Sequence, residues 1–186
     1  DQLRKPGSCG VPAPGVSIKI FNEEGKEINE PGVPGELYAK SVAVFDTYYK
    51  SHDQYLEDHR DGYQTVGDIA YVDNEGYYFI CDRKKDMIIT GGVNVYPAEI
   101  ENVLDDHPQV AEVAVFGIPD DEWGEAVCAV IVCMDNLNEK ELINFAKDRL
   151  SGPKVPKKVF IRSDLPKTGS GKVLKRELKQ WVQENS

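Results

Sequence analysis

Apolar and polar residues alternate in short runs through the first part of the chain, and this period of two is typical of β-strands. Turns rich in Gly, Pro, Asn and Asp separate the runs, and residues 51–58 alone favour a short helix. Strands joined by turns predict a small β-barrel-like lobe over residues 1–84. The strands are expected at residues 16–21, 36–39, 63–72 and 77–81.

From residue 85 onward, helical periodicity enters the pattern. A helix is expected to begin at Pro97, because a proline at the first helical position loses no hydrogen bond. Ile100, Val103 and Leu104 form the apolar stripe of this helix.

Two further helices are expected. Asn138 followed by Glu141 is the signature of a capping box and predicts a helix start, with an apolar face formed by Leu142, Phe145, Ala146 and Leu150. The last helix is expected at residues 173–182, with Leu174, Leu178 and Trp181 facing inward.

Strands are expected between these helices, at residues 110–116, 126–134 and 159–161. The second is almost entirely apolar, which is typical of a central strand. Residues 85–186 therefore predict a small α+β domain, with a sheet of about three main strands and flanking helices.

A run of charged residues, 82–86, separates the two patterns. We interpret it as the joint between two packed units. A charged hairpin turn within one domain is the alternative, and composition taken alone favours that alternative.

Composition narrows the classes of function. A chain of 186 residues with 40% hydrophobic and 29% charged residues is ordinary for a globular protein, and its net charge of −10 argues against a general nucleic-acid binder. No apolar run reaches the roughly 20 residues of a membrane helix. The chain opens without an initiator Met or an apolar leader, which favours an excised piece of a longer protein.

The four cysteines and three histidines have no metal-ligand spacing, so no metal site is predicted. Cys128 and Cys133 lie in an apolar run and are interpreted as core residues. Reduced thiols are the default interpretation, and a cytoplasmic location is expected.

The segment PKTGSGK, residues 166–172, places two glycines just before Lys172. A flexible backbone with free N–H groups beside a cation suits an oxyanion. The segment is not a Walker A loop, because Pro166 and Val173 stand where that motif needs Gly and Ser or Thr. Taken alone, an exposed loop before a helix explains it as well.

Three other positions are candidates for binding. Asp68, at the end of a strand, suits the vicinal hydroxyls of a ribose, and Arg83 suits ribose, phosphate or carboxylate. A turn residue and a surface ion pair are the ordinary alternatives. The pair Gly91 and Gly92 permits close approach to a ligand, or forms a simple tight turn.

The order of these motifs carries more information than any one of them. As a set they resemble the C-terminal signature series of the adenylate-forming enzymes, which include acyl-CoA synthetases, luciferases and the adenylation domains of peptide synthetases. The residues of these motifs are most similar to those of fatty-acyl-CoA synthetases. The motifs are TVGD (65–68), DRKKD (82–86), GG (91–92), VYPAEIE (95–101) and PKTGSGK (166–172), supported by GVPAPG (10–15), PGEL (34–37) and GIPDDEWGE (117–125).

The resemblance implies a reaction. Such enzymes activate a carboxylic acid with ATP and Mg²⁺ to an acyl-adenylate and then pass the acyl group to coenzyme A. Residues 1–84 would be the distal β lobe of a large N-terminal adenylation domain, and residues 85–186 the mobile C-terminal domain. The phosphate loop, the magnesium ligands and the acyl pocket would lie upstream, so this piece is expected to be inactive alone.

The resemblance also implies roles for six residues. Lys172 would be the catalytic lysine that bridges the acid and the ATP phosphate, and Asp68 and Arg83 would hold the nucleotide ribose. Lys85 would be the hinge. Gly91 and Gly92 would line the pantetheine path.

Some positions depart from the family pattern, and other functions stay open. Val66 replaces a common Thr, Asp82 a common Gly, and Ser41 and Thr47 stand where glycines are frequent. The alternatives are an aryl-acid ligase, an adenylation domain that loads a carrier protein, and an interaction module without chemistry. The expected partners are a small carboxylic acid, ATP and coenzyme A; peripheral membrane contact or a homodimer is left open.

Overall fold

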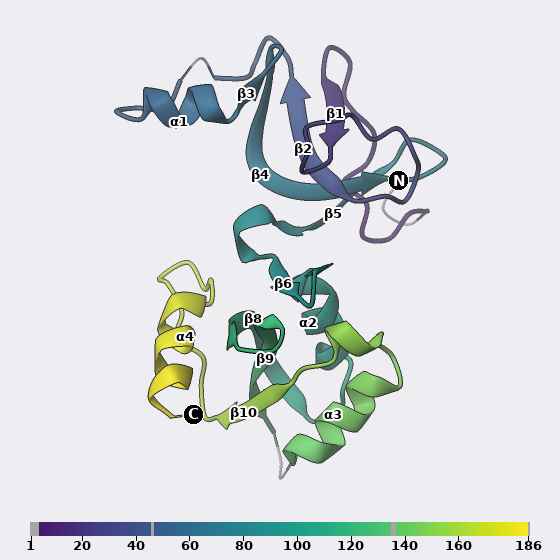
Figure 1. The fold of residues 1–186 in the computed structure, drawn as a ribbon. Coiled ribbons are helices and arrows are strands. Elements are labelled where there is room, and N and C mark those ends of the chain that lie inside the picture. Colours follow the sequence, from purple (N-terminus) through teal and green to yellow (C-terminus); the bar gives the residue numbers. More distant parts are fainter. Residues whose placement is uncertain (1–3, 46, 135–136, 186) are drawn as a thin grey trace. The chain divides into compact units, whose positions relative to one another are not determined.

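The structure is a computed structural model that describes residues 4–45, 47–134 and 137–185. The chain divides into two compact units, unit 1 from Asp1 to Lys85 and unit 2 from Asp86 to Ser186 (Figure 1). The division lies one residue after the boundary expected from the charged run. Each unit is described separately below.

Unit 1 is a curled antiparallel sheet in the order β1-β2-β4-β3, with β5 also paired to β4. The register shifts between Glu36 and Tyr38 and between Ile69 and Ala70. Such irregularities bend a strand, and Figure 1 shows the strong curve of β4. The strands are β1 (Ser17–Phe21), β2 (Gly35–Lys40), β3 (His59–Arg60), β4 (Tyr63–Val72) and β5 (Tyr78–Arg83).

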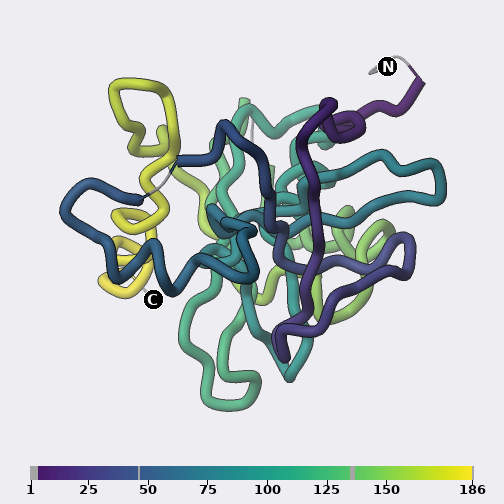
Figure 2. The backbone as a smooth tube through the Cα atoms, turned by 90° about the horizontal axis from the view of Figure 1, so that it is seen from above, coloured from purple at the N-terminus to yellow at the C-terminus, as the bar shows by residue number. Residues whose placement is uncertain are grey.

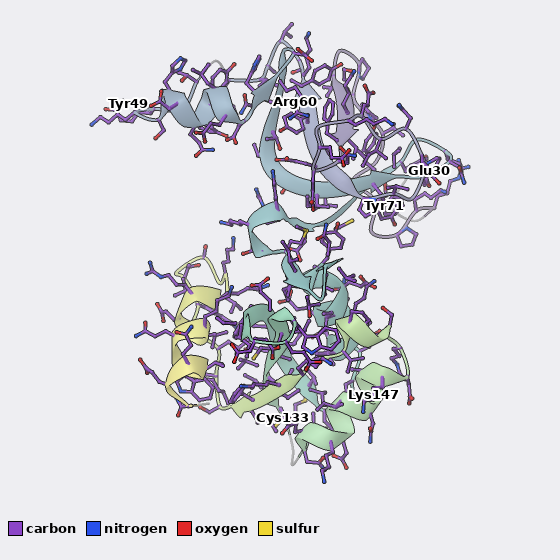
Figure 3. The ribbon with its side chains drawn as sticks, viewed as in Figure 1. Glu30, Tyr49, Arg60, Tyr71, Cys133 and Lys147 are labelled. Carbon is purple, nitrogen blue, oxygen red and sulfur yellow. The ribbon has the colours of Figure 1, made fainter. Side chains whose placement is uncertain are left out.

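The short helix α1 (His52–Glu57) follows an exposed segment and buries none of its own residues. Tyr49 in that segment is 86% exposed, and Figure 3 shows its side chain far from the sheet. Contacts between aromatic rings link the segment to the helix, as between Tyr48 and Tyr55 with ring centroids 6.5 Å apart. The sequence predicted this helix but not β3.

Unit 2 is a mixed sheet flanked by helices. Its sheet has the order β10-β9-β6-β7, with β8 also paired to β9; β10 runs parallel to β9 and the other pairs are antiparallel. The elements are β6 (Ile88–Thr90), β7 (Val93–Val95), α2 (Pro97–Asp105), β8 (Val110–Asp120), β9 (Gly124–Cys133), α3 (Glu139–Lys147), β10 (Lys158–Arg162) and α4 (Lys175–Glu184), with a short 3-10 turn at Gly152–Lys154. A second 3-10 turn, Lys84–Asp86, spans the boundary between the units.

The α+β fold expected from the sequence is confirmed. The three main strands are β8, β9 and β10, and the short hairpin β6–β7 adds two more. This hairpin joins β9 through a single pair, Thr90 with Gly124.

Strand β9 is covered on both faces. Val127, Ala129 and Ile131 face a core that includes α2 and α3, whereas Ala126, Cys128 and Val130 face a second core that includes α4. A strand buried on both faces needs apolar residues at every position, which explains the unbroken apolar run. Burial also raises the pKa of the Cys128 thiol to about 12, consistent with the expected core role.

Local signals fix the starts of two helices. Pro97 is at the start of α2, and both hydrogen bonds of the capping box between Asn138 and Glu141 are present at α3. The predicted start of the last helix is wrong by two residues, because Val173 pairs with Lys167 and leaves Leu174 as the N-cap. Leu174 is therefore half-buried outside the helix rather than on its inner face.

Within the described residues, no helix is both long enough and apolar enough to span a membrane.

Replacing Asn138 by Ala should lower the free energy of unfolding of unit 2 by about 1 kcal/mol, because α3 loses its capping side chain. Urea unfolding monitored by tryptophan fluorescence measures this change, since both tryptophans lie in unit 2. Ser151→Ala is the matched control, because Ser151 is an N-cap whose side chain makes no capping hydrogen bond. Equal losses in the two variants would contradict the role of the capping box.

Candidate functional site

Asp68 and Arg83 face each other on β4 and β5, as a paired position of the sheet. Arg83 Nε lies 3.0 Å from Asp68 Oδ1, and Arg83 Nη1 donates a hydrogen bond of 2.9 Å to the carbonyl oxygen of Val66. The Asp68 side chain is 22% exposed and the Arg83 side chain is 49% exposed. The pair is therefore fixed on the sheet and still accessible to a ligand.

A pocket of about 460 Å³ lies beside this pair, entirely within unit 1. Arg83 and Lys85 line it, as does Gly67, whereas Asp68 does not. Its mixture of carboxylates, ammonium groups and a phenol suits a polar ligand. The lining residues are Glu36, Tyr48, Gln54, Asp58, Val66, Gly67, Arg83, Lys84 and Lys85.

Glu36 holds the end of unit 1 in place. One of its oxygens lies 2.9 Å from Lys84 Nζ, and the other accepts a 3.2 Å hydrogen bond from Thr65 Oγ1. The hydrogen bond from Lys84 to Glu36 raises the pKa of that ammonium. Sequence reasoning assigned no role to Glu36, although the PGEL motif contained it; the pairing is long-range and leaves no local pattern.

Lys85 is exposed and is the last residue of unit 1, within the 3-10 turn Lys84–Asp86. The structure thus places the expected hinge residue where the chain passes between the units. Its role in motion stays a prediction.

Gly91 and Gly92 form the two-residue turn of the hairpin β6–β7, with φ angles of +57° and +76°. Positive φ at both central residues is the pattern of a type I′ turn, which strongly favours glycine. Gly91 N donates to the carbonyl oxygen of Trp123 at 2.9 Å, and a Cβ at Gly91 would lie only 2.7 Å from the Trp123 ring. A tight turn and close packing thus account for Gly91 without a ligand.

Lys172 lies in a loop that is closed on itself, here named the lysine loop (residues 166–174). Thr168 N donates to the Lys172 carbonyl at 2.8 Å, Lys172 N donates to Thr168 Oγ1 at 3.1 Å, and Leu174 N donates to the Pro166 carbonyl at 2.8 Å. Figure 2 shows this segment in yellow-green as a loop that leads into α4.

The sequence suggested free N–H groups beside Lys172. The N–H groups of Thr168, Gly171 and Lys172 donate within the loop, whereas those of Gly169 and Ser170 donate to no acceptor among the described residues. The exposed Lys172 ammonium itself forms no ion pair with any residue that the structure describes. The ammonium and the backbone N–H groups of Gly169 and Ser170 are therefore the parts of this loop available to an anion.

Of the six candidates, the structure brings Asp68 and Arg83 together and places Lys85 at the end of the same unit. Gly91, Gly92 and Lys172 belong to unit 2, on two separate turns. A carboxylate paired with a guanidinium can bind hydroxyl groups and an anion.

Comparison with known protein families decides the class. Residues 1–49 match the family model of the AMP-binding enzymes, and residues 99–172 match that of the AMP-binding enzyme C-terminal domain. The chain belongs to the adenylate-forming, AMP-binding enzyme family. Both matched segments lie in the order expected from the motifs.

Relatives of this chain are CoA ligases for different acids. The long-chain-fatty-acid–CoA ligase of Escherichia coli O6:H1 is 45% identical over 174 residues, which are 93% of this chain and 31% of that protein. The 2-succinylbenzoate–CoA ligase of Bacillus cereus is 39% identical over 182 residues, which are 98% of this chain and 37% of that protein.

A solved structure agrees with the fold. The o-succinylbenzoate CoA synthetase of Bacillus subtilis, in complex with its acyl-adenylate intermediate, has a TM-score of 0.89 and 38% identity, covering 96% of this chain and 36% of that one. The same synthetase has also been solved with ATP and a magnesium ion. The chain spans about a third of the length of these relatives.

Replacing Gly91 by Ala should lower the free energy of unfolding of unit 2 by roughly 1–3 kcal/mol, because the new methyl group adds steric conflict with Trp123 to the strain of positive φ. Gly92→Ala is the matched control, since it has positive φ but nothing within 4 Å of its added carbon. Urea unfolding compares the two. If Gly91→Ala lowers the free energy of unfolding no more than Gly92→Ala does, the close packing of Gly91 against Trp123 is not what requires glycine there.

Proposed function

We propose that the intact protein is an ATP-dependent acyl-CoA synthetase whose acid substrate is a fatty acid. In the first step, a carboxylate oxygen attacks the α-phosphorus of ATP, forming the acyl-adenylate and releasing pyrophosphate. In the second, the thiol of coenzyme A attacks the acyl carbon, forming the thioester and releasing AMP and a proton. The observation that carries the proposal is the accessible Asp68–Arg83 pair, in a chain of this family.

In this proposal, Asp68 accepts hydrogen bonds from the ribose hydroxyl groups of the nucleotide. Arg83 fixes that carboxylate and donates to the same sugar. The geometry supports these roles because the ion pair of 3.0 Å is held on facing strands, while more than a fifth of the Asp68 side chain stays accessible. A rigid, partly desolvated pair binds a diol with little reorganisation.

Lys172 acts in the first step. Its ammonium lies between the acid and the α-phosphate and lowers the barrier as negative charge develops on the phosphate oxygens. Its exposure and the absence of an ion pair with any described residue support this role. Lys85 serves as the pivot on which unit 2 turns between the two steps, and Gly91 and Gly92 line the path of the pantetheine arm.

Magnesium accompanies ATP in this proposal, but no residue of the chain is assigned to it. Within the part of the chain that the structure describes, no cluster of three or more His, Cys, Asp or Glu residues could hold a metal ion. No step of the mechanism is routed through the metal. Its contribution would be to shield the charge of the ATP phosphates.

An aryl acid is the second candidate substrate, because the 2-succinylbenzoate ligases cover as much of this chain as the fatty-acid ligases do. The higher identity to the fatty-acid enzyme, 45% against 39%, favours the fatty acid. We further propose a cytoplasmic location, with the acid, ATP and coenzyme A as partners.

Exchange of labelled pyrophosphate into ATP tests the reaction and the substrate together. We expect exchange in the longest natural form of the protein with medium- or long-chain fatty acids, and none with the 186-residue chain alone. Exchange driven by aryl acids would replace the proposed substrate. If none of the acids tested supports exchange, the proposed function is rejected. Full turnover by the purified 186-residue chain would contradict the expectation that this chain is inactive alone.

Lys172→Ala in that full-length form should lower the rate of adenylation by roughly a thousandfold, the size of effect seen when one charge-stabilising group is lost. Thioester formation from preformed acyl-adenylate should change little. Lys140→Ala, at an exposed lysine of α3, is the control and should leave both steps unchanged. Equal loss of both steps in Lys172→Ala would contradict the assigned role.

A further inference from the structure

The lysine loop is rigid within itself, so its direction depends on its two ends. Besides the hydrogen bonds already described, Gly171 N donates to the Thr168 carbonyl at 2.9 Å and Lys167 pairs with Val173 as an isolated bridge. A loop closed in this way moves as one body. The position of Lys172 therefore follows from what anchors the strand before the loop and the helix after it.

The first turn of α4, the helix after the loop, has no capping side chain. The N-cap of α4 is Leu174, which offers no side chain to cap the first N–H groups, and the first turn carries Lys175 and Arg176 beside one acidic residue, Glu177. Positive side chains at a helix N-terminus are unfavourable, because the helix dipole is positive at that end. With two positive side chains against one negative and no capping side chain, the first turn of α4 gains from outside support.

Glu101 of α2 supplies that support. Its Oε1 lies 2.8 Å from Lys175 Nζ and also accepts a hydrogen bond of 2.8 Å from Val115 N of β8. The side chains of Lys175 and Glu101 are 25% and 24% exposed. Because a backbone group of the central sheet fixes the carboxylate, this pair differs from a mobile surface ion pair.

At the other end of the loop, Leu165 is buried in the core that includes α4, and the ion pair is the more exposed one. Lys167 pairs with Glu112 at 2.7 Å, but the two side chains are 39% and 36% exposed, and no other hydrogen bond fixes Glu112 Oε2 among the described residues. Exposed pairs of this kind contribute little. Of the two ion pairs that flank the lysine loop, the one formed by Glu101 is therefore the firmer.

We propose that Glu101 is a positioning residue for Lys172: through Lys175 it holds the first turn of α4 against β8 and thereby sets the direction of the lysine loop. Glu101 touches neither substrate nor reacting atoms in this proposal. Its importance for the reaction rests on the proposed function of Lys172, whereas its effect on the loop does not.

The chain offers a matched control on the same helix. Glu99, two residues earlier in α2, forms an ion pair of 2.7 Å with Lys154, which lies in the short turn Gly152–Lys154 rather than next to the lysine loop. Glu99→Gln and Glu101→Gln make the same chemical change, and each removes one partly exposed ion pair of unit 2. In Glu101→Gln the amide oxygen of the new side chain can still accept the hydrogen bond from Val115, so the sheet contact is kept.

Hydrogen exchange on the 186-residue chain tests the anchoring without any catalysis. In Glu101→Gln, the amides of residues 168–178 should exchange roughly fivefold faster than in the unchanged chain, as the loss of one partly exposed ion pair predicts. Glu99→Gln should leave them unchanged, and Lys175→Arg, which keeps the charge, should stay near the unchanged chain. Equal exchange in Glu101→Gln and Glu99→Gln would overturn the anchoring.

The half-reactions of the full-length form test the consequence for Lys172. Glu101→Gln should lower kcat of pyrophosphate exchange roughly tenfold, because misplacing a catalytic group by a fraction of an ångström is costly. Its KM for ATP and its rate of thioester formation from preformed adenylate should stay within about twofold. A general loss of stability would lower both half-reactions, and that outcome would reject the positioning role.

The two proposals fail in different ways. If the unchanged full-length form shows no exchange with any acid, the proposed function fails and takes the catalytic consequence of Glu101 with it, while hydrogen exchange still decides the anchoring. If the unchanged form adenylates its acid and Glu101→Gln does so at the same rate, the proposed function stands and the positioning role is wrong.

Discussion

The double burial of β9 is the constraint on which unit 2 depends. Alternate residues of this strand face the core shared with α2 and α3 and the core shared with α4, so both cores share one backbone. Each fully buried Val or Ile on the strand contributes about 1.5–3 kcal/mol. Since the lysine loop leads directly into α4, and α4 packs on one of these faces, the strand also sets where that loop can lie.

Much of this arrangement could be predicted from local sequence. The apolar run of β9 indicated a central strand, and the capping pair of Asn138 and Glu141 and the proline at residue 97 marked helix starts that the structure confirms. These signals act within a few residues of the chain, which is the range over which periodicity and capping operate. For the site, the motif order led to the family, and Asp68 and Arg83 are adjacent in the sheet.

What the sequence did not predict depends on contacts between distant residues. The hairpin β6–β7 has three residues in each strand, too few for periodicity to detect β7, and the start of α4 is displaced because Val173 pairs with Lys167. The carboxylates of Glu36 and Glu101 are the clearest cases. Glu36 pairs with Lys84, 48 residues further along the chain, and Glu101 pairs with Lys175, 74 residues further along. Such pairs leave no periodic trace.

The chain passes from unit 1 to unit 2 once, at Lys85 and Asp86. Hydrolysis of that one peptide bond would leave every strand of either sheet on its own piece, because no strand pair among the described residues joins the units. The peptide bond between Lys85 and Asp86 thus acts as a tether, and it affects how often the two units encounter each other by limiting how far apart they can move. A short link of this kind keeps two partners at an effective concentration on the order of millimolar. Two separately produced pieces would have to be mixed near that concentration to meet as often as they do in the intact chain.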